Sequence, residues 1–144
     1  TIKGVVMSNA MTDYFEAGLL NQIFRGQSIT LPSTGVFIGL TSDYPDEATP
    51  TANELAGNGY LRVHVPTGNF DPPTVDGSGQ LVSNNTPITF PQATGNWGYA
   101  SGVIISDSLA GGNIFFKGGL TTPRDVLLGD TFRFNTSDLD IKFD

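Results

Sequence analysis

The chain has 144 residues, of which 18 are Gly and 9 are Pro, and its 14 acidic and 7 basic residues give a formal net charge of −7. A chain this poor in Lys and Arg lacks the basic surface that attracts nucleic acid or anionic membranes, so we expect neither as a partner. The absence of Cys excludes disulfides, thiol nucleophiles and zinc-thiolate sites.

The first twelve residues lack strong periodicity and are predicted to form an N-terminal arm, with one edge strand from Lys3 to Met7 as the alternative. Residues 13–144 are numerous enough to bury one hydrophobic core without disulfides or a structural metal, so we expect a single β-rich domain there. The chain start has one cation and a short apolar patch broken by Gly4, which does not match a signal peptide. No apolar run approaches the roughly 18 residues that a membrane span needs.

One amphipathic helix is predicted, over about residues 13–25. Asp13 is the expected N-cap, and Glu16 three residues later completes a capping-box pattern. Gly26 is expected to end the helix in the left-handed conformation. Apolar residues recur at helical spacing along one face, which predicts that a sheet covers that face; they are Phe15, Leu19, Leu20, Ile23 and Phe24.

After Gly26 the chain alternates short apolar segments with turns rich in Gly or Asp, which predicts about eight short strands. The expected fold is mainly β, an antiparallel β-sandwich or open barrel with the one N-terminal helix. In residues 61–65 polar and apolar side chains alternate, so Leu61 is expected to face the core and Arg62 and His64 the opposite side. Trp97, beside a turn, is expected to be buried. The other predicted strands cover residues 36–40, 88–90, 102–106, 113–117, 126–128, 131–134 and 139–143.

Two long segments do not follow the strand pattern. Residues 42–59 form an acidic loop, and residues 66–87 form a second loop rich in Pro, Gly and Asp. Loops of this length in a compact domain are usually functional surfaces or mobile. We therefore take the loops around Tyr44 and Phe70, together with the arm, as candidate contacts with a partner; the arm residues are Ile2, Lys3, Val5, Val6 and Met7.

The sequence contains no recognisable catalytic, phosphate-binding or EF-hand motif. His64 is the only histidine and no Gly-x-Ser-x-Gly elbow occurs, so a Ser-His-Asp triad is unsupported. The Gly-rich turns match neither a phosphate-binding loop nor a dinucleotide fingerprint. Carboxylates between Asp43 and Glu54 offer oxygen ligands for a hard cation, although their spacing does not match an EF-hand. We therefore expect no enzyme, no catalytic residue, no cofactor and no metal, and whether this acidic loop binds a cation stays open.

Six segments, taken in their order along the chain, resemble a known family. They cover residues 13–26, 36–42, 53–63, 88–98, 112–123 and 129–134, and the match extends from about Asp13 to Phe143. The chain is similar to small tailed-phage virion proteins loosely labelled tail-fibre or minor tail proteins, some of which serve as head decoration. The resemblance implies a structural role without catalysis, in a fold dominated by antiparallel strands.

Two functions follow as hypotheses. The first is a capsid cement or decoration protein, which would bind the major capsid protein on the outer surface of the head and stabilise capsomer contacts. Its N-terminal arm would add a strand to a neighbouring subunit. The alternative is a tail or tail-fibre component, an adaptor or host-contact module with tail proteins as partners. Both place the protein on the virion surface after synthesis in the bacterial cytoplasm, and both allow a homodimer or homotrimer. A polysaccharide-degrading enzyme is a third hypothesis.

Overall fold

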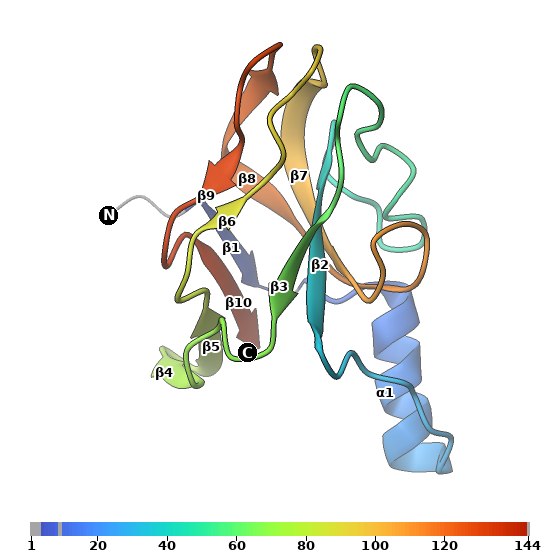
Figure 1. Cartoon of the computed structure of the whole chain (residues 1–144). Coiled ribbons are helices and arrows are strands. Elements are labelled where there is room, and N and C mark those ends of the chain that lie inside the picture. The colour runs from blue at the N-terminus through green and yellow to red at the C-terminus, as the bar shows by residue number, and fades with distance from the viewer. Residues whose placement is uncertain (1–3, 9, 144) are drawn as a thin grey trace.

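The computed structural model describes residues 4–8 and 10–143 and confirms the predicted fold class (Figure 1). The chain is mainly β, with an α-helix near its N-terminus and mostly antiparallel strand pairs. In chain order the elements are β1 (Val5–Ser8), α1 (Asp13–Arg25), β2 (Gly35–Thr41), β3 (Val63–Pro66), β4 (Thr74–Asp76), β5 (Gly79–Ser83), β6 (Ile88–Thr89), β7 (Gly98–Ser106), β8 (Ile114–Val126), β9 (Arg133–Phe134) and β10 (Leu139–Phe143).

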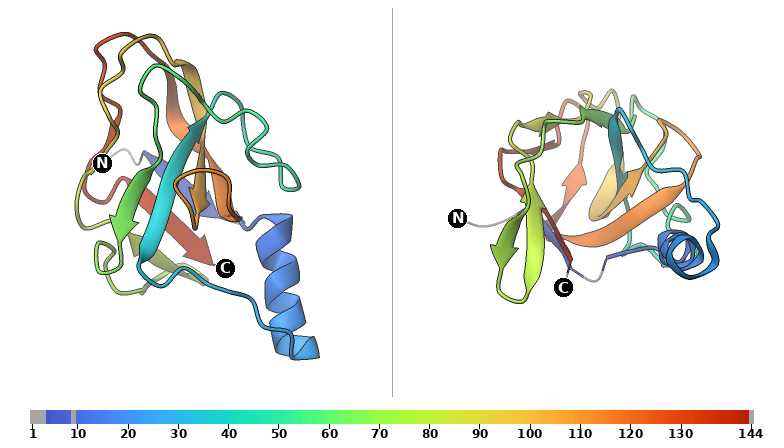
Figure 2. Two further views of the ribbon diagram at one scale, coloured as in Figure 1. Left: turned by 45° about the vertical axis from the view of Figure 1, so that its right-hand side comes forward. Right: turned by 90° about the horizontal axis from the view of Figure 1, so that it is seen from below.

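The strands form an open barrel made of two larger sheets and a short ribbon. The sheets have the strand orders β1-β10-β5-β4 and β3-β2-β7-β8, and the ribbon is β6-β9. The chain around β1 joins the two sheets along β8, because the amide of Thr121 donates to the carbonyl of Gly4 (2.9 Å) and that of Lys117 to Ala10 (2.8 Å). Figure 2, seen from below, shows the strands surrounding the interior with α1 at one side of the barrel.

Part of the expected N-terminal arm is a strand of this barrel. β1 pairs in parallel with β10, with Val5 opposite Leu139, and the Val5 side chain is fully buried. Val5 therefore has no exposed side-chain surface to offer to a partner. Of the other candidate contacts in the arm, Val6 and Met7 belong to β1, and Ile2 and Lys3 lie outside the described residues.

β8 is longer than the sequence pattern predicts. Two separate strands are predicted, at residues 113–117 and 126–128, and Gly118, Gly119 and Pro123 lie between them. Instead β8 runs without interruption for 13 residues. Its register with β7 shifts between Ala100 and Gly102, so the segment that contains Pro123 has no β7 partner and the missing proline N–H costs no β7 ladder bond.

The loop predicted over residues 66–87 contains a hairpin that the sequence analysis missed. β4 and β5 pair antiparallel across a turn at Gly77, whose φ of 63° is left-handed. Because Asp76 pairs with Gly79, the two central residues of the turn are Gly77 and Ser78. A Gly at the first central position is a signal for a two-residue hairpin turn, since that position needs a positive φ in such a turn. This hairpin adds the edge strand β4 to the first sheet.

Aromatic rings fill the upper part of the barrel. Phe90 is 1% exposed and packs edge on against Phe132 and Phe134. Its ring centroid lies 5.6 Å from that of Phe132 and 6.5 Å from that of Phe134. Trp97 is buried as predicted, and its indole N–H donates to the carbonyl of Asn58 (2.8 Å). This ring thereby attaches the loop at Asn58 to the core.

Candidate interaction surface

The first turn of α1 is fixed to β8 through Thr12. The Thr12 Oγ1 accepts a hydrogen bond from the amide of Phe15 (3.4 Å) and donates to the carbonyl of Ile114 (2.5 Å). Thr12 is therefore the N-cap, and the prediction of Asp13 was wrong by one residue. Thr and Asp are both good N-caps, and the buried contact with β8 decides between them. Gly26 ends the helix with φ 67°, as predicted.

Packing on two sides holds the first half of α1 in place. The ring of Phe15 packs edge on against Phe115 and Phe116 of β8, with centroids 5.1 and 5.2 Å away. On another side, Gly18 lies so close to Ile29 that a Cβ at Gly18 would fall 2.2 Å from the Ile29 Cδ1. The segment that returns from the helix to β2 therefore packs closely along its flank.

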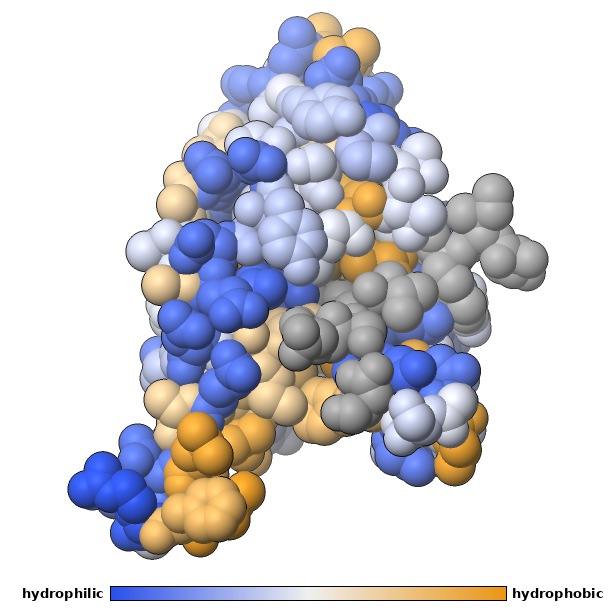
Figure 3. Space-filling model, turned by 180° about the vertical axis from the view of Figure 1, so that it is seen from behind, coloured by the Kyte–Doolittle hydropathy of each residue, from blue (hydrophilic) through white to orange (hydrophobic). Residues whose placement is uncertain are grey.

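The second half of α1 exposes apolar side chains that were predicted to lie against a sheet. Leu20, Ile23 and Phe24 are 58%, 67% and 77% exposed, and we call these three residues the apolar ridge. The expectation was wrong because α1 projects past the barrel and leaves no sheet beside its last turns (Figures 1 and 2). Figure 3 shows apolar surface, in orange, gathered at the tip of the helix. No helix of the described residues is long and apolar enough to cross a membrane.

An apolar groove of about 410 Å³ lies between the two sheets. Phe70, one of the candidate contact residues, lines it, although its side chain is only partly exposed. β5 and β10 supply one wall, and the ends of β2, β7 and β8 supply the other; these wall residues include Val36, Leu81, Val82, Ile105, Phe116, Ile141 and Phe143.

The structure separates most of the loop carboxylates that the sequence places close together. Asp43 accepts a hydrogen bond from the amide of Tyr44 (2.8 Å), and Asp46 accepts from the amides of Ala48 (2.8 Å) and Thr49 (3.2 Å). The bonds from Ala48 and Thr49 lower the pKa of Asp46. These carboxylates order the turns of their own loop.

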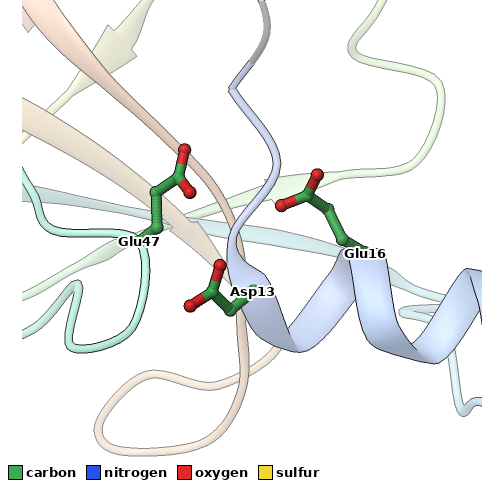
Figure 4. Close-up of side chains that lie close together, drawn as sticks. All are labelled: Asp13, Glu16 and Glu47. Atoms are coloured by element: carbon green, nitrogen blue, oxygen red, sulfur yellow. The ribbon is translucent and has the colours of Figure 1, made fainter.

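Glu47 instead lies beside two acids of the first helical turn, Asp13 and Glu16. Their carboxylate oxygens lie within 4.8 Å of one another, and Figure 4 shows the three side chains around one space. All three residues are exposed, and the Glu47 Oε1 also lies 3.6 Å from the Nζ of Lys117. Asp13 and Glu16 are also favoured at this end of α1 by the helix dipole.

A polar network in the barrel wall joins the buried Arg62 to the partly buried Glu54 and Tyr60. Arg62 donates to both oxygens of Glu54 (2.8 and 2.7 Å) and to the carbonyls of Ser108 and Gly111 (2.8 and 2.9 Å). The hydrogen bonds that Arg62 donates to Glu54 raise the pKa of Arg62, and burial together with the Glu54 charge raises the pKa of Tyr60. With these partners satisfied, the network ties two loops to the sheet.

This network reverses the predicted facing of residues 61 and 62. Arg62 is 4% exposed and Leu61 is 53% exposed, because β3 begins only at Val63 and the preceding residues do not alternate across a sheet. His64 is exposed on β3 as predicted, and its ring packs 4.8 Å from that of Phe37. Tyr44, the remaining contact candidate, is exposed, with the Lys117 Nζ 4.9 Å from its ring centroid.

One comparison with known proteins identifies a relationship. A family model described as podophage GP4 fiber I protein gp80 matches residues 10–142. The match runs from just before α1 into β10, and it includes the apolar ridge and every residue that lines the apolar groove except Phe143. No curated protein sequence matches the chain significantly.

Proposed function

The chain belongs to the podophage GP4 fiber I protein gp80 family, a fibre-type family of phage virion structural proteins, and from this premise we propose that it is a non-enzymatic component of the tail fibre. The match over residues 10–142 is the observation that carries the proposal. It also confirms the resemblance to small phage virion proteins that the six sequence segments indicate. Tail proteins are the proposed partners, joined after synthesis in the bacterial cytoplasm.

The tail-fibre hypothesis is now favoured over the cement hypothesis. The family description names a fibre protein and contains no reference to the capsid. The cement mechanism also relied on a free arm that adds a strand to a neighbouring subunit. Residues Val5–Ser8 already pair with β10 of their own chain, so that backbone is engaged. This pairing supports a role that does not depend on strand donation by these residues.

The arrangement of the polar side chains supports a role without catalysis. His64 packs on Phe37 at the barrel surface, and Glu54 is held by Arg62 and Tyr60. A general acid or base must be within reach of substrate and near its working pKa, and these groups are instead occupied in holding strands and loops. Incubating the chain with host surface polysaccharide should release no fragments; measurable depolymerisation would overturn this part of the proposal.

Labelling of intact virions tests the location. Antibody fragments raised against the chain and coupled to gold should mark the tail region in electron micrographs. Particles that lack the protein serve as the control for nonspecific labelling. Signal distributed over the whole head would contradict the proposal and restore the cement hypothesis.

A further inference from the structure

The apolar ridge and the apolar groove are complementary surfaces on one chain. We propose that the partner of the apolar ridge is a second copy of this chain, which receives the ridge in its own apolar groove. The ridge is convex and carries three large exposed side chains, Leu20, Ile23 and Phe24. The groove is concave and apolar, with a volume of about 410 Å³. Its volume is in the range of roughly 300–1,000 Å³ that accepts a compact apolar group.

The positions of the two surfaces favour a reciprocal pair. α1 projects from the end of the barrel at which β4 and β5 lie (Figure 1), and β5 supplies one wall of the groove. A second hollow, between the base of α1 and the barrel, shares Val36, Ile105 and Phe116 with the groove. The apolar surface is therefore continuous from the groove to the base of α1. A helix seated in the groove of a second copy would extend along this continuous surface.

The size of the contact also favours reciprocity. A specific interface buries about 800 Å² on each partner, more than three partly exposed side chains supply. When each copy contributes both its ridge and its groove, the interface contains two ridge-to-groove contacts, which doubles the buried area. Such an isologous arrangement closes on itself and does not grow into a filament.

The net charge of the chain opposes this contact at long range, whereas the charged side chains near the contact favour it. Each copy has a net charge of −7, so two copies repel each other through water. Near the contact the signs are opposite, because Arg25 ends the ridge helix and the exposed Asp71 follows Phe70 at the groove. Added salt screens the net repulsion, so the pairing should tighten as ionic strength rises.

The oligomeric state of the 144-residue chain tests the proposal. In size-exclusion chromatography with light scattering, the chain should approach the mass of a dimer as its concentration rises. Ile23→Glu and Phe24→Glu should each weaken the association at least about tenfold, since each places a charge in an apolar contact. Leu128→Glu is the matched control, because Leu128 is 69% exposed but lies outside the ridge and the groove. Circular dichroism checks that each variant is folded.

Disulfide trapping tests the seating directly, since the chain contains no Cys of its own. A mixture of Ile23→Cys and Gln80→Cys chains should form a mixed disulfide under mild oxidation, because Gln80 lines the groove. A mixture of Leu128→Cys and Gln80→Cys chains should form at least about tenfold less mixed disulfide under the same conditions.

A chain that stays monomeric, a ridge variant that associates like the unmodified chain, or equal trapping in the two mixtures would each overturn the proposal. A larger assembly with the same dependence on Ile23 and Phe24 would overturn the reciprocal pair. All measurements use the isolated chain, so their outcome is independent of where the protein lies in the virion.

Discussion

The barrel and α1 contain the same kinds of apolar residue but place them in opposite environments. Phe90 of the barrel is 1% exposed among other rings, whereas Phe24 near the end of α1 is 77% exposed. Burial of a Phe side chain contributes about 1.5–3 kcal/mol relative to exposure. The barrel residues therefore stabilise the fold, while the apolar ridge adds little to the stability of one chain. Helical periodicity in a sequence identifies an apolar face, but it does not identify what covers that face.

The largest test of this contrast is Phe90→Ala. The substitution leaves a cavity among Phe132, Phe134 and Tyr60, and it should lower the free energy of unfolding by about 3–5 kcal/mol. Urea unfolding followed by fluorescence measures the loss. Leu128→Ala is the control and should change stability by less than about 0.5 kcal/mol. Equal losses for the two variants would show that burial does not separate them.

The variant Arg62→Met tests whether a buried polar residue stabilises the barrel as strongly as a buried apolar residue does. The change leaves the Glu54 carboxylate, whose side chain is 17% exposed, without its cationic partner. We expect a loss of about 3 kcal/mol in urea unfolding, at the lower end for a broken buried pair. The exposed Arg133→Met is the control. A loss below about 1 kcal/mol would mean that Glu54 finds water or another donor in the variant.

Thr12→Ala tests how firmly α1 is attached to the barrel. It removes the N-cap oxygen and the hydrogen bond to Ile114, so it should cost about 1–2 kcal/mol. Hydrogen exchange should show faster exchange in the first turn of α1 than in β7. Thr12→Ser keeps the hydroxyl and should lose less. Identical exchange in the Ala variant and the unmodified chain would contradict the assigned cap.

The smallest effect is expected for the double variant Ile23→Ser and Phe24→Ser. Both side chains are mostly exposed, so in dilute, monomeric samples the free energy of unfolding should change by less than about 0.5 kcal/mol. Thermal and urea unfolding at low protein concentration measure it. A loss near that of Phe90→Ala would show that the ridge is covered within its own chain, which would remove the contrast with the barrel.

Local signals in the sequence were sufficient for the elements whose ends depend on neighbouring residues. The predicted helix and α1 coincide at residues 13–25, since Gly26 provides a left-handed ending that few other residues adopt. The strand expected at residues 36–40 lies within β2, and that at residues 102–106 lies within β7. These segments have strongly apolar, β-branched sequences bounded by turn residues.

The remaining features depend on contacts between residues far apart in the chain. The Thr12 cap is selected by Ile114, 102 residues away, and the burial of Arg62 depends on Glu54 and on the turn at Gly111. The course of β8 through Pro123 depends on the shifted register with β7. The exposure of the apolar ridge could not be predicted from local sequence either, because it depends on where the barrel ends relative to the last turns of α1.

The length and position of β8 have a mechanical consequence for the molecule. An extended strand rises about 3.3 Å per residue, so its 13 residues run about 40 Å along the barrel. One end of β8 is bonded to the chain just before α1, through Thr12 and Ala10, and the other end pairs with the start of β7 at Gly98. Tension applied between α1 and the opposite end of the barrel would load these hydrogen bonds in shear, so that many must break together. The hydrogen bonds along β8 are therefore the part of the fold that resists such tension.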